Sequence, residues 1–178
     1  MTHIAIQPLT AANQADLNRC DNSFAVEAEL CVRAEDGRIG YTLRSVTPYL
    51  KRYGPEIYDA QVYIRQPDHA AWLAYVDGKL AGQILVREHW NRLAIVWDIA
   101  VDPPFRRQGV GRRLMELAVR WARERGLPGV MLETQNINVA ACRLYESCGF
   151  VLSGFDVSLY RGIEPDTREV ALFWYLLF

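Results

Sequence analysis

Residues 93–111 read LAIVWDIAVDPPFRRQGVG, an apolar run followed by a turn that holds two glycines. The run from Leu93 to Val101 contains a single charge, Asp98, and this pattern is typical of a β-strand covered on both faces. Residues 109–125 then carry apolar side chains at helical spacing, with arginines on the opposite face. The stretch therefore predicts a strand, a tight glycine turn and an amphipathic helix, in that order.

The sequence downstream continues the alternation of strands and helices. Residues 129–134 predict a strand, and 138–147 predict a helix that Gly149 ends. Two further strands are expected over 150–160 and 169–177. Alternating strands and helices of this kind predict an α/β fold, with a mixed sheet built around one strand–helix–strand–helix unit.

The sequence upstream predicts a hairpin and less regular elements before it. Two apolar runs, 72–76 and 80–86, flank Asp77-Gly78, a dipeptide that favours a tight hairpin turn. Nearer the N-terminus, alternation at Ile4 and Ile6 predicts a strand, 11–20 could form a helix, and 40–46 is strand-like. The length of 178 residues suits one domain, which we take to span 1–178.

The composition is that of an ordinary soluble globular protein, with 51% hydrophobic and 23% charged residues. Twenty Lys and Arg against 21 Asp and Glu leave a formal charge of −1, which argues against a general nucleic-acid binder. The longest uncharged apolar run, 170–178, is far too short to span a bilayer, and no signal-peptide pattern is visible. We therefore expect a cytoplasmic protein without a membrane or nucleic-acid partner. The oligomeric state stays open, with a homodimer among the options.

Cysteines and histidines give no indication of a metal site. The four cysteines form no Cys-x-x-Cys pair, and the three histidines have no ligand spacing. We expect free thiols and no metal.

The turn between the strand and the helix has the features of an anion site. Residues 106–111 read RRQGVG and precede a helix whose first backbone N–H groups have no partner within the helix. Glycines allow a ligand to approach the backbone, and a helix N-terminus favours phosphate. Between residues 101 and 125, seven arginines accompany three acids. A pyrophosphate cradle and a tight turn with a solvated basic face both fit this spacing.

Two common phosphate-binding motifs do not match this turn. Gly111 is followed by Arg112-Arg113 rather than Lys-Ser/Thr, so the nucleoside-triphosphate loop is incomplete. The dinucleotide fingerprint needs a third glycine, and Leu114 stands at that position.

The motif Arg106-x-x-Gly109-x-Gly111 does resemble the acetyl-coenzyme A signature of the GNAT-type N-acetyltransferases. Downstream, Asn138-x-x-Ala141-x-x-x-Tyr145-x-x-x-Gly149-Phe150 is similar to the second conserved helix and the following strand of that family. The resemblance covers about residues 72–160. It implies one acetyl-CoA-binding domain with a central mixed, mostly antiparallel sheet of about six to seven strands flanked by helices.

The resemblance also implies roles for individual residues. Backbone groups of the strand would contact the pantetheine arm, the turn would hold the pyrophosphate, and Asn138 would bind the cofactor arm or cap its helix. Tyr145 would be the acid that protonates the departing sulfur, although a core tyrosine on an apolar helix face is the alternative. The expected cofactor-binding residues are Ile99, Ala100, Val101, Arg106, Arg107, Gln108, Gly109, Val110, Gly111, Arg112, Asn138 and Tyr145.

The general base has two candidates. Asp98 lies on the central strand just before the expected cofactor contacts, and Glu133 lies at the end of the next strand. Many members of the family carry a carboxylate at or beside position 97, where this chain has Trp97. Direct proton abstraction and a relay through water both stay open, as does an ordinary ion-pair role for either acid.

A further set of segments resembles the streptothricin (nourseothricin) acetyltransferases over nearly the whole chain. They include Asp21-Asn-Ser-Phe24, Leu132-Glu-Thr-Gln135 and Cys148-Gly-Phe150. This resemblance implies acetylation of an amine on the β-lysine arm of a cationic antibiotic. Asp21 and Asp156 are the first candidates for an acidic wall that binds such a substrate.

Three other functions compete with this interpretation. The chain could acetylate another amine, such as a protein N-terminus, a polyamine or an amino acid. It could be a non-catalytic acyl-CoA-binding module, although Tyr145 argues against that. An RNA-binding role for the arginines is disfavoured by the nearly neutral total charge.

Overall fold

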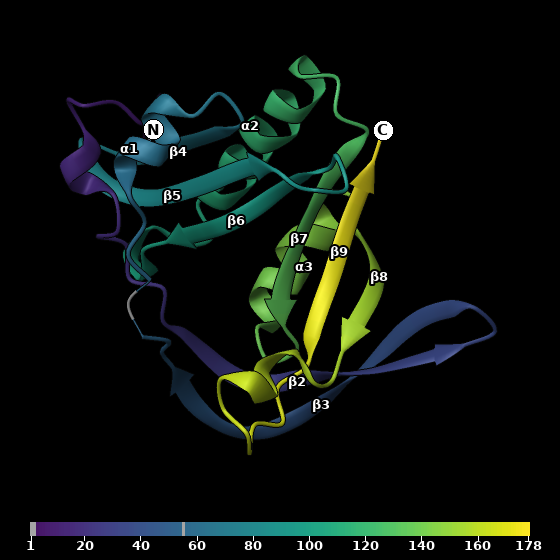
Figure 1. Cartoon of the computed structure of the whole chain (residues 1–178). Coiled ribbons are helices and arrows are strands. Elements are labelled where there is room, and N and C mark those ends of the chain that lie inside the picture. Colours follow the sequence, from purple (N-terminus) through teal and green to yellow (C-terminus); the bar gives the residue numbers. More distant parts are fainter. Residues whose placement is uncertain (1–2, 55) are drawn as a thin grey trace. The chain divides into compact units, whose positions relative to one another are not determined.

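The computed structural model describes residues 3–54 and 56–178, and the chain divides into two compact units (Figure 1). Unit 1 comprises the described residues of 1–23 and 52–130 together with Phe178. Unit 2 comprises residues 24–51 and 131–177. The glycine turn belongs to unit 1 and Tyr145 belongs to unit 2.

Unit 1 is built on four antiparallel strands in the order β1-β4-β5-β6. They are β1 (Ile4–Pro8), β4 (His69–Val76), β5 (Lys79–Glu88) and β6 (Ala94–Val101). The turn between β4 and β5 has positive φ at both Asp77 (48°) and Gly78 (78°), which is the geometry that matches the twist of a tight hairpin. The hairpin expected over residues 72–86 is therefore confirmed.

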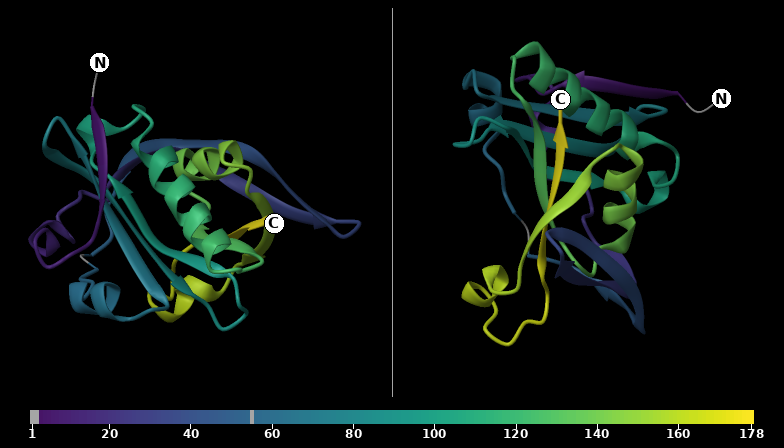
Figure 2. Two further views of the ribbon diagram at one scale, coloured as in Figure 1. Left: turned by 90° about the horizontal axis from the view of Figure 1, so that it is seen from above. Right: turned by 90° about the vertical axis from the view of Figure 1, so that its right-hand side faces the viewer.

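Helices cover both faces of the strands in unit 1 (Figure 2). Helix α2 (Val110–Glu124) packs on one face, where a Cβ added at Gly82 would lie 3.2 Å from Leu114 and 3.3 Å from Val110. On the other face, Leu73 and Leu85 form a cluster with residues around α1 (Ala60–Arg65) and the short helix η1 (Gln14–Asp16). Apolar side chains therefore pack against both faces of the strands in unit 1.

Unit 2 contains a long hairpin and three further strands. The hairpin strands β2 (Phe24–Glu35) and β3 (Arg38–Lys51) meet at Asp36-Gly37, again with positive φ at both positions. Strand β7 (Gly129–Gln135), most of which belongs to this unit, is followed by α3 (Val139–Ser147), β8 (Val151–Asp156) and β9 (Ala171–Leu177). These strands are ordered β7-β9-β8.

A buried asparagine connects the segments of unit 2. Asn136 is 5% exposed, and its side chain donates to the Leu30 carbonyl at 3.2 Å and accepts from the Val170 N–H at 2.9 Å. Its backbone bonds the same two residues, because Leu30 N donates to Asn136 O and Asn136 N donates to Val170 O. One residue therefore satisfies polar groups that the apolar core would otherwise leave unpaired.

The α/β fold class is confirmed, and so is the order of strand, turn, helix, strand and helix over residues 93–147. Two expectations differ from the structure. Only a short 3₁₀ turn forms within 11–20, and the strand expected over 150–160 ends at Asp156, followed by a 3₁₀ turn, η3 (Leu159–Gly162). Strand β2 and helix α1 were not expected.

Candidate active site

The N-terminus of α2 begins at the glycine turn, and its N-cap residue makes no side-chain capping hydrogen bond. After β6, the chain makes a 3₁₀ turn, η2 (Pro103–Phe105), and then adopts positive φ at Arg107 (63°) and Gly109 (86°). Gly109 is the N-cap residue, and a Cβ placed on it would meet no atom within 4 Å. Because the first N–H groups of a helix have no acceptor within it, an open and positively polarised terminus remains, which fits a diphosphate.

The polar side chains of the turn brace its backbone. The Arg106 guanidinium donates to the Val101 carbonyl at 2.7 Å and to the Asp21 carbonyl at 3.1 Å. The Gln108 amide donates to the Pro104 carbonyl at 2.9 Å. These bonds fix the shape of the turn, so its contribution to phosphate binding is expected to come mainly from the backbone N–H groups of residues 108–112.

Strand β6 contains a β-bulge at its centre. Val96 pairs with Val86 and Asp98 pairs with Leu85, so Trp97 is an extra residue opposite this step of β5. The Trp97 side chain is 47% exposed, and its ring stacks on the Arg87 guanidinium at 4.0 Å. Beyond the bulge, Asp98 lies on the face of the sheet that also carries Leu85 and Gln83.

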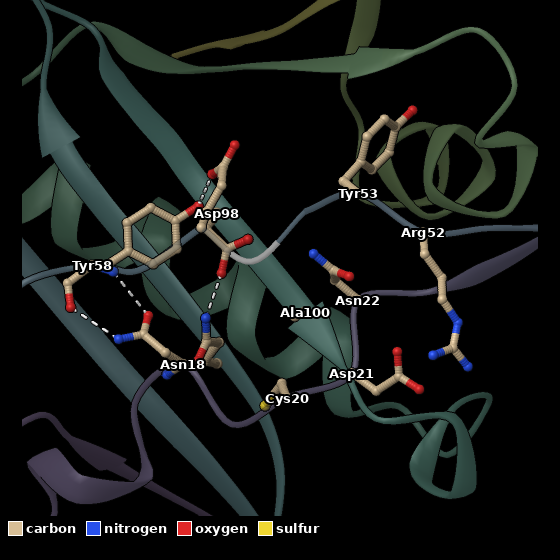
Figure 3. A pocket seen from close by; sticks show the side chains of 11 residues that line it. Asn18, Cys20, Asp21, Asn22, Arg52, Tyr53, Tyr58, Asp98 and Ala100 are labelled. Carbon is tan, nitrogen blue, oxygen red and sulfur yellow. Dashed lines mark hydrogen bonds between the residues drawn. The ribbon is translucent and has the colours of Figure 1, made fainter.

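Asp98 lines a cavity of about 270 Å³ within unit 1 (Figure 3). Its walls come from the loop between β1 and β2, the segment between β3 and α1, and strands β5 and β6. Asn18, Cys20 and Asp21 come from the first of these, and Arg52, Glu56 and Tyr58 from the second. The strands contribute Gln83, Asp98 and Ala100. Figure 3 shows the Asp98 carboxylate beside the Tyr58 ring.

The environment of Asp98 changes its acidity. The pKa of the carboxyl rises from 3.8 to about 6, mainly because of burial; the hydrogen bond from Gln83 at 2.7 Å opposes the rise, and the Glu56 charge adds to it. The neighbouring Tyr58 hydroxyl donates to Glu56, and burial together with the Asp98 charge raises its pKa. Near neutral pH Asp98 is therefore ionised but basic enough to take a proton, as a general base requires.

The two acids expected to bind substrate differ in their surroundings. Asp21 lines the cavity, and a hydrogen bond from the Ser23 backbone N–H lowers the pKa of its carboxyl. Asp156 belongs to unit 2, where its carboxylate accepts from the backbone N–H groups of Ser158 (2.7 Å) and Leu159 (3.1 Å). This bonding stabilises the turn after β8, and a substrate-binding role for Asp156 stays a prediction.

The remaining expected site residues lie in unit 2. Tyr145 is 5% exposed, and its ring lies 6.4 Å from that of Phe150 and 6.3 Å from that of Trp174. Asn138 caps α3 by accepting from the Ala141 N–H at 3.2 Å, one of the two roles anticipated for it. Glu133 accepts a hydrogen bond from the Tyr160 hydroxyl. The roles of Tyr145 as the acid and of Glu133 as an alternative base stay predictions.

Eight residues that line the cavity were not predicted from the sequence: Asn18, Cys20, Asn22, Arg52, Tyr53, Glu56, Tyr58 and Gln83. Gln83 had a sequence signal, because it is a polar residue that interrupts an apolar run. The other seven lie in irregular segments, where no periodicity marks them. Among the described residues, no group of three or more His, Cys, Asp or Glu is placed to hold a metal ion, and no helix is long and apolar enough to cross a membrane.

Comparison with known proteins identifies the class. The model of the acetyltransferase (GNAT) family matches residues 38–150, and the chain belongs to this family. Over nearly its full length the chain is similar to streptothricin acetyltransferases. It is 36% identical to streptothricin acetyltransferase A of Bacillus subtilis (strain 168), over 97% of this chain and 99% of that protein. It is 37% identical to streptothricin acetyltransferase of Escherichia coli, over 97% and 94%.

Solved structures agree with this relationship. A crystal structure assigned as a streptothricin acetyltransferase from Bacillus anthracis str. Ames, in complex with acetyl coenzyme A, has a TM-score of 0.92 and 40% identity, covering 99% of this chain and 100% of that one. The crystal structure of a nourseothricin acetyltransferase has a TM-score of 0.83 and 33% identity, covering 98% of each chain. The expectation of a GNAT fold that uses acetyl-CoA is therefore confirmed.

Proposed function

We propose that this acetyltransferase transfers the acetyl group of acetyl-CoA to an amine on the β-lysine arm of streptothricin-type antibiotics, and so confers resistance to them. Two relatives that match nearly the whole chain are named streptothricin acetyltransferases, which supports this class of substrate. The observation on this chain that carries the proposal is the cavity with Asp98 in its wall. The four free cysteines fit a protein that works in a reducing cytoplasm.

The charge of the cavity suits a substrate with several ammonium groups. Three carboxylates, those of Asp21, Glu56 and Asp98, line it, against one cationic side chain, that of Arg52. Two tyrosines, Tyr53 and Tyr58, add aromatic surface on which a cation can rest. An amine with a neutral or acidic arm would lose this complementarity.

Deprotonation of the acceptor amine is the first requirement of the reaction. A lysine-like amine has a pKa of about 10 and has no free electron pair when it is protonated. Asp98 would take one proton from this ammonium group, directly or through water, and the amine could then attack. Because the raised pKa of Asp98 narrows the gap to that of the amine, the transfer costs less than it would with an ordinary carboxylate.

When bound, acetyl-CoA supplies an activated thioester, so the overall reaction forms a C–N bond, breaks a C–S bond and releases one proton to solvent. The turn at 107–112 would hold the diphosphate through its backbone N–H groups, and β6 would offer its backbone at Ile99, Ala100 and Val101 to the pantetheine arm. The Tyr145 hydroxyl would give a proton to the departing sulfur and recover one from the acetylated nitrogen.

The test is a thiol-release assay on the purified chain with acetyl-CoA and streptothricin. We expect thiol release that requires both substrates, with Tyr145→Phe reducing kcat. Thiol release no higher than in the blank without antibiotic would refute the proposed acceptor, and a panel of polyamines, amino acids and peptide N-termini would then identify the amine. Binding of acetyl-CoA without turnover on any of these would show a binding module instead.

A further inference from the structure

We propose that Gln83 is a positioning residue for the general base: it holds the Asp98 carboxylate in the cavity and keeps it in the form that accepts a proton. This inference rests on the proposed function only in that Asp98 is taken as the base. The hydrogen bonds that support it lie entirely within unit 1.

The Gln83 side chain is fixed from both ends. Its Oε1 accepts from the Asn18 backbone N–H at 3.0 Å, and its Nε2 donates to Asp98 Oδ2 at 2.7 Å. A backbone N–H can only donate, so the bond to Asn18 assigns the oxygen of the amide to that side and leaves the nitrogen for Asp98. Gln83 is 4% exposed, and such a buried amide is retained at low cost only where both of its ends are bonded.

The anchor at Asn18 is itself held in place. Asn18 has a φ of 67°, in the left-handed region, and its side chain bonds the backbone of Tyr58 twice. Asn18 Nδ2 donates to the Tyr58 carbonyl at 2.9 Å, and the Tyr58 N–H donates to Asn18 Oδ1 at 3.1 Å (Figure 3). A continuous chain of hydrogen bonds therefore runs from the segment before α1, through the loop after β1, to strands β5 and β6.

The register of the sheet explains why Gln83 reaches Asp98. Gln83 pairs with Ala100 and Leu85 pairs with Asp98, so Gln83 and Asp98 are diagonal neighbours on one face of the sheet. The Gln83 amide thus reaches Asp98 Oδ2 from the neighbouring strand β5, and this bond does not occupy the other carboxylate oxygen, Oδ1. This is the arrangement expected of a residue that orients a base without blocking the substrate.

Gln83 also sets the charge state of Asp98. Burial and Glu56 both favour the protonated acid, and the Gln83 hydrogen bond is the contact that favours the carboxylate. The other titratable groups near Asp98 are Cys20 and Asp21 from the loop, Arg52, Tyr53 and Tyr58 from the segment before α1, and Tyr63 on α1. Without the donor, Asp98 would hold its proton at a higher pH, so a smaller fraction of it would be ionised and able to accept a proton at neutral pH.

The decisive variant is Gln83→Glu. It keeps the size of the side chain and an acceptor for the Asn18 N–H, and it replaces the donor facing Asp98 with a second acidic oxygen. Gln83→Leu removes both contacts and serves as the second variant. Gln61→Glu is the matched control, because Gln61 on α1 bonds Gln14 at 2.8 Å and does not line the cavity.

The first readout is the pH profile of kcat/KM for streptothricin, which rises with pH as the base loses its proton. For both Gln83 variants we expect the acid limb to move to higher pH, with activity reduced about tenfold or more near pH 6.5 and recovering toward wild type near pH 9. Gln61→Glu should keep the wild-type profile. An unmoved acid limb in a variant that is uniformly slower at every pH would overturn the proposal.

The second readout needs no substrate. Carboxyl-carbon NMR of protein with labelled aspartate follows the titration of Asp98 directly, with Asp98→Asn identifying its signal. Titration at a higher pH in the Gln83 variants supports the inference even where streptothricin is not acetylated, so its outcome is separate from that of the proposed function. An unchanged Asp98 titration in folded Gln83→Glu would refute it.

Discussion

Neutralising Asp98 should stabilise the protein while it removes activity. The folded state raises the pKa of this carboxyl from 3.8 to about 6, so at neutral pH the chain carries a buried charge that the unfolded chain holds more easily. A rise of this size corresponds to at most about 3 kcal/mol of the free energy of unfolding. Asp98→Asn keeps the shape and an oxygen for the Gln83 donor, and it does not carry this cost.

The upward direction of the Asp98 pKa shift determines the pH range in which the two proteins differ in stability. A raised pKa means that the folded state binds the proton more tightly, so Asp98 adds stability below pH 4 relative to neutral pH, and that stability is lost as the pH rises through 4 to 6. The stability of Asp98→Asn relative to wild type should therefore grow over this range and level off above about pH 7.

Urea unfolding at several pH values measures this difference, with parallel thiol-release assays. The contributions of the other titrating groups to the pH dependence of stability are the same in both proteins, so they cancel in the difference. Glu116→Gln, at an exposed position on α2, is the control for losing one negative charge at the surface. Parallel stability curves for wild type and Asp98→Asn across pH 4–8 would refute the argument that burial perturbs Asp98.

Three further substitutions test the supporting geometry. Gly82→Ala would place a Cβ 2.8 Å from the Ala100 carbonyl oxygen and should lower the free energy of unfolding by about 1–3 kcal/mol, whereas Gly40→Ala in β3, with no atom within 4 Å, should be nearly neutral in the same urea titration. Gly109→Val should weaken acetyl-CoA binding measured by calorimetry, while Gly126→Val, also at positive φ but past the other end of α2, should retain binding despite a similar backbone strain. Asn18→Gly keeps the left-handed backbone and the N–H to Gln83 but loses both bonds to Tyr58, so kcat/KM for the acceptor should fall; an unchanged kcat/KM would contradict this.

Local chemistry accounts for the elements that were predicted correctly. The Asp77-Gly78 turn, the apolar stripe of α2 and the positive-φ glycines after α2 and α3 are each determined by neighbouring residues. Strand β2 had a similar signal, since Phe24, Val26 and Leu30 alternate with exposed or half-buried neighbours and are all buried, but the acids between them obscured it. The helix expected over 11–20 fails because Asn13 bonds Thr10 and because Asn18 adopts a left-handed backbone, which together favour a turn.

The cavity was harder to predict because most of its walls come from irregular chain. Asn18 and Tyr58 are forty positions apart and meet only through tertiary hydrogen bonds, so no local pattern in the sequence connects them. Asp21 and Asp98 were found through the family resemblance. Asp21 lies in a segment that resembles related enzymes, and Asp98 lies on the strand just before the expected cofactor contacts.

The bulge at Trp97 shows why finding Asp98 in the sequence is not enough to place it. In a regular strand, side chains alternate between faces, so with Val96 opposite Val86, Trp97 would pair with Leu85 and Asp98 would pass to the face covered by α2. There its charge would meet the apolar side chains of Val110 and Leu114. The extra residue shifts the register by one, so that Asp98 reaches the Gln83 face, and the Trp97 ring is accommodated on Arg87. A single irregularity in the pairing therefore converts an unfavourable buried charge into a candidate base.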